Sequence, residues 1–336
     1  MAKAPLPFPK KQTVAIIGGD SLLARELREL LEAEKHTRVQ LISAAAEDAT
    51  VLTADDEEAV VMLPLSGESL EGTTIAYLAG TPASSRRTLK LGAKGKRFLI
   101  DLTGALAEQP GAQLRAPSAE PQAKAKATSG VHVIAHPAAI ALTMILTRLA
   151  AVAKIRSSLV HVFEPASERG RRGIEELRKQ TVGVLGFKKL DITVFDTQLA
   201  FNLLARYGEE APEPLEGIEE RIERDTAALL AAWTEMPMPS IRLVQAPVFH
   251  GHSMSVWVEF DTNVDTKQLS RVLTAAGIDV RPDEPPSNAN IAGQSGLSVG
   301  AVNADRNNPR ACWIWMVADN LRLSAENAVA VGKEQL

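Results

Sequence analysis

The sequence has little cysteine, since Cys312 is the only one among 336 residues. A single cysteine excludes an intrachain disulfide and a cysteine-based metal cluster. Cys312 lies in the apolar segment 311–317 ("ACWIWMV"), which favours a buried core thiol over a reactive one. The sequence also lacks a membrane-spanning run, because prolines interrupt its first 19 residues and no later segment reaches roughly 20 apolar residues. We therefore expect a soluble, cytoplasmic protein.

An excess of charge of one sign is lacking as well. The 37 basic and 41 acidic residues leave a net charge of −4. This balance gives no electrostatic reason to expect a nucleic-acid or anionic-membrane partner. With 45% hydrophobic residues the chain can bury a large core, and its length favours two domains.

The first third of the chain alternates short apolar runs with helical patterns. This alternation is typical of a Rossmann-like, doubly wound and mostly parallel sheet in an α/β protein. The predicted strands are residues 13–19, 38–45, 59–64, 74–80 and 97–104, and the predicted helices are 21–34 and 82–95. Residues 107–130 are poor in large apolar groups, which predicts a loop or linker and a domain boundary near residue 130.

The pattern after this boundary predicts a second, α+β domain over residues 131–318. Its predicted helices are residues 141–153, 171–186, 218–233 and 266–277. Its predicted strands are residues 157–167 and 310–320, together with a long strand pair over 240–260. The apolar strands 255–260 and 312–317 could support the sheet of a dimer.

A glycine-containing loop follows the first predicted strand and carries the candidate cofactor-binding residues. The loop consists of Gly18, Gly19, Asp20, Ser21, Leu22, Leu23 and Ala24. A dinucleotide-binding turn favours glycine at its first, middle and last positions, and only Gly18 meets this requirement, although Ala24 is also small. Ser21 places a side chain where phosphate would approach, and Asp20 adds a negative charge or serves as the helix N-cap. The loop is therefore either a dinucleotide site or a strand-turn-helix that no longer binds one.

Seven segments, in order along nearly the whole chain, resemble the aspartate-semialdehyde dehydrogenase family. They are "VAIIGGDSLLARELRELL", "YLAGTPASSRRTL", "LIDLTGAL", "GRRGIEELRKQT", "LAFNLLARYG", "PVFHGHSMSVWVEF" and "VADNLRLSAENAV". The resemblance implies a homodimer with an NADP-binding domain, a catalytic and dimerisation domain, and a C-terminal helix (319–336) that returns to the first domain. It also assigns Asn320 to cofactor binding. Members reductively dephosphorylate aspartyl phosphate to aspartate semialdehyde, a step of amino-acid biosynthesis, through a cysteine thioester.

The resemblance also indicates which residue stands at each position of the family's active site. The family's Asn-Pro-X-Cys turn reads His-Pro-Ala-Ala over 136–139, so that Ala139 occupies the position of the nucleophile. Glu164 replaces a glutamine beside the thioester, and a carboxylate there would repel an anionic substrate. Ala107 and Gln245 replace two arginines that hold phosphate and carboxylate. The base histidine is retained as His252.

Two further candidates have less specific signals. Arg221 falls near a substrate-binding lysine of the family, although a charge on an amphipathic helix is more often simply solvated. His250 precedes His252 by two residues, so that both would project from one face of a strand. We expect no metal at this pair, because no carboxylate or thiol is placed to complete a ligand set.

Three functional hypotheses remain open at this point. The first is a catalytically degenerate member of the family that keeps its fold and dimer and binds a small ligand or an active relative. The second is an NAD(P)-dependent oxidoreductase that uses His252 or Glu164 without a cysteine thioester. The third is a structural protein whose fold serves only to dimerise.

Overall fold

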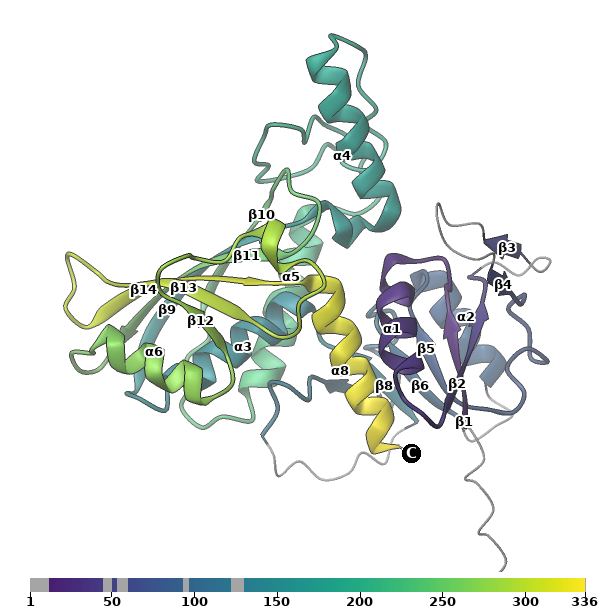
Figure 1. Ribbon diagram of the computed structural model, residues 1–336, viewed down its shortest axis with the longest axis horizontal. Helices are drawn as coiled ribbons and strands as arrows, with labels where there is room; N and C mark the ends of the chain where they lie inside the picture. The colour runs from purple at the N-terminus through teal and green to yellow at the C-terminus, as the bar shows by residue number, and fades with distance from the viewer. Residues whose placement is uncertain (1–11, 45–49, 53–59, 93–96, 122–129, 336) are drawn as a thin grey trace, which may run out of the picture. The chain divides into compact units, whose positions relative to one another are not determined.

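The computed structural model describes residues 12–44, 50–52, 60–92, 97–121 and 130–335 (Figure 1). The chain divides into two compact units. The first comprises Met1–Arg115, Ala125–Ile134 and Ala328–Leu336, and the second comprises Ala116–Lys124 and Ala135–Asn327. The chain thus passes between the units after Arg115, Lys124, Ile134 and Asn327, and the third of these points lies a few residues beyond the boundary predicted from composition. None of the helices in the described part of the chain is long and apolar enough to cross a membrane.

The first unit contains a fully parallel six-stranded sheet, which confirms the predicted Rossmann-like architecture. Its strands lie in the order β2-β1-β5-β6-β8-β7. Their bounds are β1 Gln12–Ile17, β2 Thr37–Ile42, β5 Thr73–Leu78, β6 Phe98–Asp101, β7 Gln113–Arg115 and β8 Val131–Ile134. The other elements are β3 Thr50–Leu52 paired with β4 Val60–Met62, and the helices α1 Leu22–Glu32 and α2 Pro82–Gly92. The strands are buried because parallel strands carry continuous apolar runs.

Strand β7 lies inside the segment for which composition predicts only a loop, and this part of the prediction is wrong. Residues 113–115 pair with β8 in parallel, and Arg115 is buried. The Arg115 guanidinium donates to both carboxylate oxygens of Glu334, at 3.0 and 2.8 Å. A three-residue strand with one large apolar side chain, Leu114, carries no readable period, which is why the pattern missed it.

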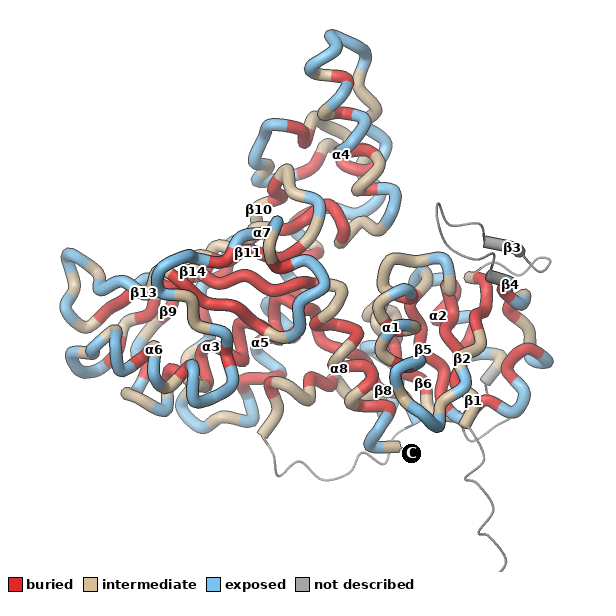
Figure 2. Tube along the Cα trace, in the orientation of Figure 1, coloured by how far each residue is buried: buried red, intermediate tan, exposed pale blue. Residues whose placement is uncertain are grey.

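The second unit contains a six-stranded mixed sheet, in the order β10-β9-β11-β14-β13-β12. The bounds are β9 Ile155–Glu164, β10 Ser240–Gln245, β11 His252–Phe260, β12 Asp279–Arg281, β13 Ser298–Ala304 and β14 Ala311–Ala318. The helical elements are α3 Pro137–Leu149, η1 Ala166–Arg169, α4 Gly170–Leu185, α5 Leu215–Leu230, α6 Thr266–Ala275 and α7 Asn288–Ile291. Helix α8, Asn320–Glu334, begins in this unit and ends in the first, which includes Ala328–Leu336. Every residue of helix α3 except Arg148 is buried, and the buried colour predominates along strands β11 and β14 in Figure 2.

The strands β10 and β11 do not form the predicted strand pair. Each instead pairs with β9, β10 in parallel and β11 antiparallel. The segment 246–251 therefore crosses over β9 to connect β10 with β11, instead of forming a hairpin turn. The sequence pattern finds both strands but carries no information about the strand that enters between them.

One face of the second sheet carries large apolar side chains that remain partly exposed. Leu159, Trp257 and Trp313 face one another across three neighbouring strands. Leu159 is 39% exposed and Trp313 is 38% exposed. The indole nitrogens of Trp257 and Trp313 both donate to one Asp305 carboxylate oxygen, at 2.9 and 3.0 Å. We call this row of Leu159, Trp257 and Trp313 the apolar row.

The glycine-containing loop of the first unit is held by its own backbone. Gly18 has a φ of +84°, a conformation that glycine adopts without strain. A Cβ added at Gly18 would overlap Cα of Gly80 and lie 2.6 Å from its nitrogen. The N-cap of α1 is Ser21, whose Oγ accepts from the Ala24 amide at 3.0 Å, so Asp20 does not have the capping role. Gly18 is thus required by the turn and by the close approach of a second chain segment.

We predict that Gly18→Ala destabilises the protein more than Gly72→Ala does. Both glycines have positive φ, but a Cβ at Gly72 meets nothing within 4 Å. Gly72→Ala should lower the free energy of unfolding by about 1 kcal/mol from backbone strain alone. Gly18→Ala should lower it by a further ~1–3 kcal/mol from the steric overlap. Chemical denaturation measures both, and equal losses would contradict the close approach to Gly80.

Candidate functional site

Three predicted site residues lie side by side where the strands of the second sheet end. Gln245 pairs with Glu164 between β10 and β9, and His252 pairs with Ala318 between β11 and β14. The pairing of Ser253 with Phe163 brings His252 and Glu164 next to each other across β11 and β9. Gln245, Glu164 and His252 are 0%, 0% and 1% exposed. The register of the sheet therefore assembles this cluster from residues far apart in the sequence.

Glu164 forms the centre of the cluster. Its Oε2 lies 3.2 Å from Nε2 of His252, and its Oε1 lies 3.3 Å from the Arg169 guanidinium. Arg169 pairs in addition with Glu213 at the surface. The cost of burying a carboxylate is several kcal/mol unless it is paired, and here a histidine and an arginine face its two oxygens. The negative charge expected to repel an anionic substrate is therefore offset inside the protein.

The turn that corresponds to the family's nucleophile lies at the start of α3. His136 is the N-cap, with its Nδ1 accepting from the Ala138 amide at 3.2 Å, and Pro137 is the first helical residue. The His136 amide donates to the Asp225 carboxylate at 2.9 Å. Ala139 lies in the first turn of the helix and is completely buried. The backbone is that of a helix N-terminus, and the residue that the resemblance places at the nucleophile position contributes only a methyl group there.

Arg221 is connected to this turn by Asp225, which contacts both Arg221 and the backbone of His136. Its Nε is 3.6 Å from the Asp225 carboxylate, one helical turn further along α5. Arg224 lies 3.7 Å from the other oxygen of the same carboxylate. Asp225 therefore links two arginines to the backbone of His136, a contact that no sequence spacing indicates.

The pKa values of the two buried histidines are shifted in opposite directions. Burial lowers the pKa of His136 well below its usual value, and the positive charges of Arg221, His252 and Arg169 lower it further. Burial also opposes the charged form of His252, but the hydrogen bond with Glu164 and the charge of Glu168 outweigh it, and the pKa of His252 is raised. The ring centroids are 5.5 Å apart. The surroundings thus disfavour the charged form of His136 and favour the charged form of its neighbour His252.

Gln245 uses its side chain entirely within the protein. The Tyr207 hydroxyl donates to Gln245 Oε1 at 2.5 Å, and Gln245 Nε2 donates to the carbonyls of Glu164 and Ala246 at 2.8 and 3.2 Å. Burial and the charge of Glu164 raise the pKa of Tyr207, so its hydroxyl stays protonated as a donor. Gln245 therefore holds the backbone of Glu164.

Asn320, assigned to the cofactor by resemblance, connects three segments of the same cluster. Its Oδ1 accepts from the Ser167 hydroxyl at 3.1 Å and from the Gly251 amide at 3.0 Å. Its Nδ2 donates to the Glu168 carboxylate at 2.7 Å. Burial raises the pKa of Glu168, with a further contribution from the charge of Glu164. Asn320 therefore positions Glu168 and the segment that precedes His252.

The other predicted candidates lie outside this cluster. His250 does not share a strand face with His252, because β11 begins at His252 and Gly251 has a φ of +82°. The alternation of a strand therefore does not extend back to His250. Ala107 and the loop 18–24 belong to the first unit, where Ala107 is exposed. The expectation that no carboxylate accompanies His252 is wrong, since Glu164 is its hydrogen-bond partner.

Sequence reasoning did not assign a role in the site to Tyr207, Asp225, Glu168 or Arg169. Glu168 and Arg169 are visible in the sequence as two adjacent charged residues that follow the predicted strand 157–167. Tyr207 and Asp225 carry no signal in the sequence, because each reaches the cluster from a separate segment through tertiary packing.

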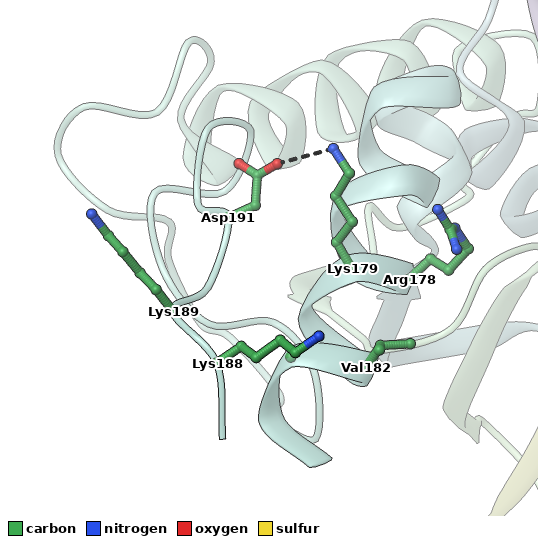
Figure 3. A pocket seen from close by; sticks show the side chains of 7 residues that line it. Arg178, Lys179, Val182, Lys188, Lys189 and Asp191 are labelled. Carbon is green, nitrogen blue, oxygen red and sulfur yellow. Dashed lines mark hydrogen bonds and ion pairs between the residues drawn. The ribbon is translucent and has the colours of Figure 1, made fainter. Parts of the chain in front are cut away.

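A separate hollow of about 280 Å³ lies on α4 and the chain that follows it (Figure 3). Its lining residues are Arg178, Lys179, Val182, Gly183, Lys188, Lys189 and Asp191. Lys179 pairs with Asp191 at 3.4 Å, and Arg178 pairs with Glu175. The Arg178 and Lys179 side chains are 61% and 51% exposed, so this hollow is a solvated surface feature. It contains none of the predicted site residues.

Comparison with known proteins assigns the chain to a family. The family model described as "Semialdehyde dehydrogenase, dimerisation domain" matches residues 146–323, a range that includes Glu164, His252 and Asn320. A USG-1 protein homolog from Pseudomonas aeruginosa is 29% identical over 327 residues, covering 95% of this chain and 96% of that protein. An aspartate-semialdehyde dehydrogenase from Rickettsia bellii is 24% identical and covers 97% of this chain and 98% of its own length.

A solved structure agrees with these sequence matches. The structure of a probable aspartate-semialdehyde dehydrogenase from Pseudomonas aeruginosa has a TM-score of 0.83 and 29% identity. The likeness covers 96% of this chain and 98% of that chain, so both units take part in it. The chain belongs to the aspartate-semialdehyde dehydrogenase family.

Proposed function

We propose that this protein is a catalytically degenerate member of its family, which keeps the fold and a homodimeric assembly without the thioester reaction. The observation that carries the proposal is the completely buried Ala139 in the first turn of α3. A thioester needs a sulfur nucleophile, and an alanine methyl group cannot form one. The degenerate site would serve to bind a small ligand or an active relative.

Cys312 does not replace the missing nucleophile. It lies within β14, opposite Val258 of β11, and is completely buried. Burial raises the pKa of its thiol to about 12, so the thiolate is scarce at neutral pH. Reactive cysteines have lowered rather than raised pKa values. The buried thiol is a part of the core, as its apolar sequence context predicts.

The state of His252 also supports the proposal. A general base must be able to accept a proton from the reacting group, with a pKa near the working pH. The pKa of His252 is raised, since the Glu164 hydrogen bond and the Glu168 charge outweigh burial, and its Nε2 is directed at Glu164. The nitrogen that would accept a proton from a substrate is therefore already engaged by the Glu164 carboxylate.

The residues of the glycine-containing loop fit the family's cofactor, NADP, poorly. The amides of Gly18 and Gly19 both donate to the Ile42 carbonyl, at 2.8 and 3.1 Å. A dinucleotide-binding turn instead directs its backbone amides toward the pyrophosphate. The Ser21 hydroxyl, at the position of the middle glycine, is engaged with the Ala24 amide. These contacts favour a strand-turn-helix that does not bind a dinucleotide.

A second candidate function is an NAD(P)-dependent oxidoreductase that uses His252 and Glu164 without a thioester. The observation in its favour is that these two side chains form a buried acid–base pair with a separation of 3.2 Å. This candidate requires a nicotinamide cofactor, so cofactor binding separates it from the first.

The apolar row supports a homodimer. Exposed apolar patches on a sheet face are typical of protein interfaces, and this sheet lies within the residues matched by the dimerisation-domain model. In a dimer, the indole rings of Trp257 and Trp313 would lose water while keeping their hydrogen bonds to Asp305.

We expect no NADP-dependent, phosphate-dependent oxidation of aspartate semialdehyde by the wild-type protein or by Ala139→Cys. The variant adds a thiol at a helix N-terminus but leaves Glu164 and Gln245 in place of the family's residues. A spectrophotometric assay for NADPH measures turnover, with a family dehydrogenase as the positive control. Turnover that His252→Ala abolishes and His250→Ala preserves would overturn the proposal.

Calorimetric titration with NADP, NADPH and NAD should give no heat of binding at micromolar concentrations. The reason is that the loop amides and the Ser21 hydroxyl already bind protein acceptors and donors. Binding at micromolar affinity would instead favour the second candidate function and would direct a substrate search to His252 and Glu164.

Trp313→Glu should convert the dimer to a monomer in analytical ultracentrifugation. A carboxylate in the apolar row would be desolvated without a partner in the interface, and the loss of affinity should be at least about 100-fold. Lys267→Glu, an exposed change to glutamate on α6, is the matched control and should leave the dimer intact. A wild-type protein that sediments as a monomer would exclude the homodimer.

A further inference from the structure

We propose that His136, Glu164 and His252 form a binding site for a divalent transition-metal ion such as Zn²⁺. In the part of the chain that the structure describes, one ligand atom from each of the three residues lies within 4.8 Å of the other two. All three side chains are buried, at 2%, 0% and 1% exposure. The inference depends on this geometry and not on any reaction of the family.

The three ligands come from rigid elements that hold them in place. Glu164 ends β9 and His252 begins β11, so the register of two adjacent strands fixes their separation. His136 is the N-cap of α3, and its backbone amide donates a hydrogen bond to the Asp225 carboxylate. Ligands on strands and at a helix cap are more precisely oriented than ligands on loops.

The chemistry of the donors selects the class of ion. Two imidazole nitrogens and one glutamate oxygen are the ligands of open zinc sites, which keep a fourth position for water. Imidazole suits Zn²⁺, Cu²⁺, Fe²⁺ and Ni²⁺, whereas Mg²⁺ and Ca²⁺ favour sites made only of oxygen. Around Zn²⁺ the ligand atoms would lie about 3.3 Å apart. His252 and Glu164 already meet this separation at 3.2 Å, and the cluster as a whole would have to contract modestly.

Two buried nitrogens of the cluster lack a hydrogen-bond partner among the described residues. They are Nε2 of His136 and Nδ1 of His252. A buried polar atom without a partner costs about 1–3 kcal/mol. Coordination through Nε2 of His136 would satisfy the first of these two atoms. The lack of a hydrogen-bond partner at Nε2 of His136 is therefore a second observation that points to a ligand.

Coordination at Nε2 of His136 has a local cost. The ring proton would move to Nδ1, which now accepts from the Ala138 amide at 3.2 Å. That hydrogen bond would be lost and a buried donor left, so binding at this site should be weaker than at one whose ligands need no such change.

The charges around the site are mixed, with Arg169 and Arg221 near His136 and a second carboxylate, that of Glu168, beside them. Glu168 Oε2 lies 3.8 Å from Nε2 of His136 and adds a second carboxylate next to the site. Arg169 binds the Glu164 oxygen that does not face His252, which would orient the ligating carboxylate. The ion would replace the proton that Glu164 and His252 now share.

Titration of the full-length protein with Co²⁺, after treatment with a chelator, tests the site. Cobalt bound by nitrogen and oxygen ligands in a four- or five-coordinate site absorbs strongly in the visible range, and Zn²⁺ should displace it. We expect saturation at about one ion per chain, without competition from Mg²⁺. Glu164→Gln and His252→Gln should each weaken binding at least about 100-fold.

Two control variants separate this site from adventitious binding. His250→Ala and His161→Ala remove half-buried histidines outside the cluster and should leave the affinity unchanged. Loss of binding in either control, or binding that persists in both Glu164→Gln and His252→Gln, would overturn the proposal.

The wild-type protein provides a measurement that does not depend on whether the variants fold. Zn²⁺ should raise its melting temperature, and metal analysis after gel filtration should find about one bound ion per chain. A wild-type protein that retains no Zn²⁺ or Co²⁺ would also overturn the proposal. That result would leave the absence of thioester chemistry unaffected, so the two proposals fail separately.

Discussion

The buried carboxylate of Glu164 is the constraint on which the centre of the second unit depends. An isolated carboxylate at this depth would be expensive, and the two groups that face it, Arg169 and His252, make its burial tolerable. Arg169 and His252 must in turn be held in position by other contacts. Arg169 is held from η1, and the start of β11 is held through the Asn320 bond to the Gly251 amide. A single charge therefore determines the polar contacts of several segments.

The cluster consequently has a structural role that is separate from chemistry. Gln245 supports the backbone of Glu164, and Asp225 supports the first turn of α3. In a buried polar network, removal of one member leaves its neighbours without partners at a cost of about 1–3 kcal/mol each. Selection for stability would retain such a network whether or not the protein catalyses a reaction. Preserved polar residues at this position are for that reason weak evidence of turnover.

Much of the architecture could be predicted from the sequence, because apolar runs and helical periods report burial directly. The parallel sheet, the mixed sheet and the burial of Cys312 follow from such patterns. Strand β7 and the insertion of β9 between β10 and β11 could not, since three residues have no period and strand order is a tertiary property. In the cluster, resemblance indicated Glu164, Gln245 and His252, whereas Tyr207 and Asp225 enter only through packing.

The close approach of Gly18 to Gly80 bears on how sequence signatures are interpreted in degenerate proteins. Here the first glycine of a nucleotide-binding fingerprint is needed to let two segments of the polypeptide pass each other. This position is therefore constrained whether or not a nucleotide binds, whereas the middle position, Ser21, serves as the cap of α1. The first glycine is a marker of ancestry and fold, and the middle position is the more informative indicator of whether a nucleotide is still bound.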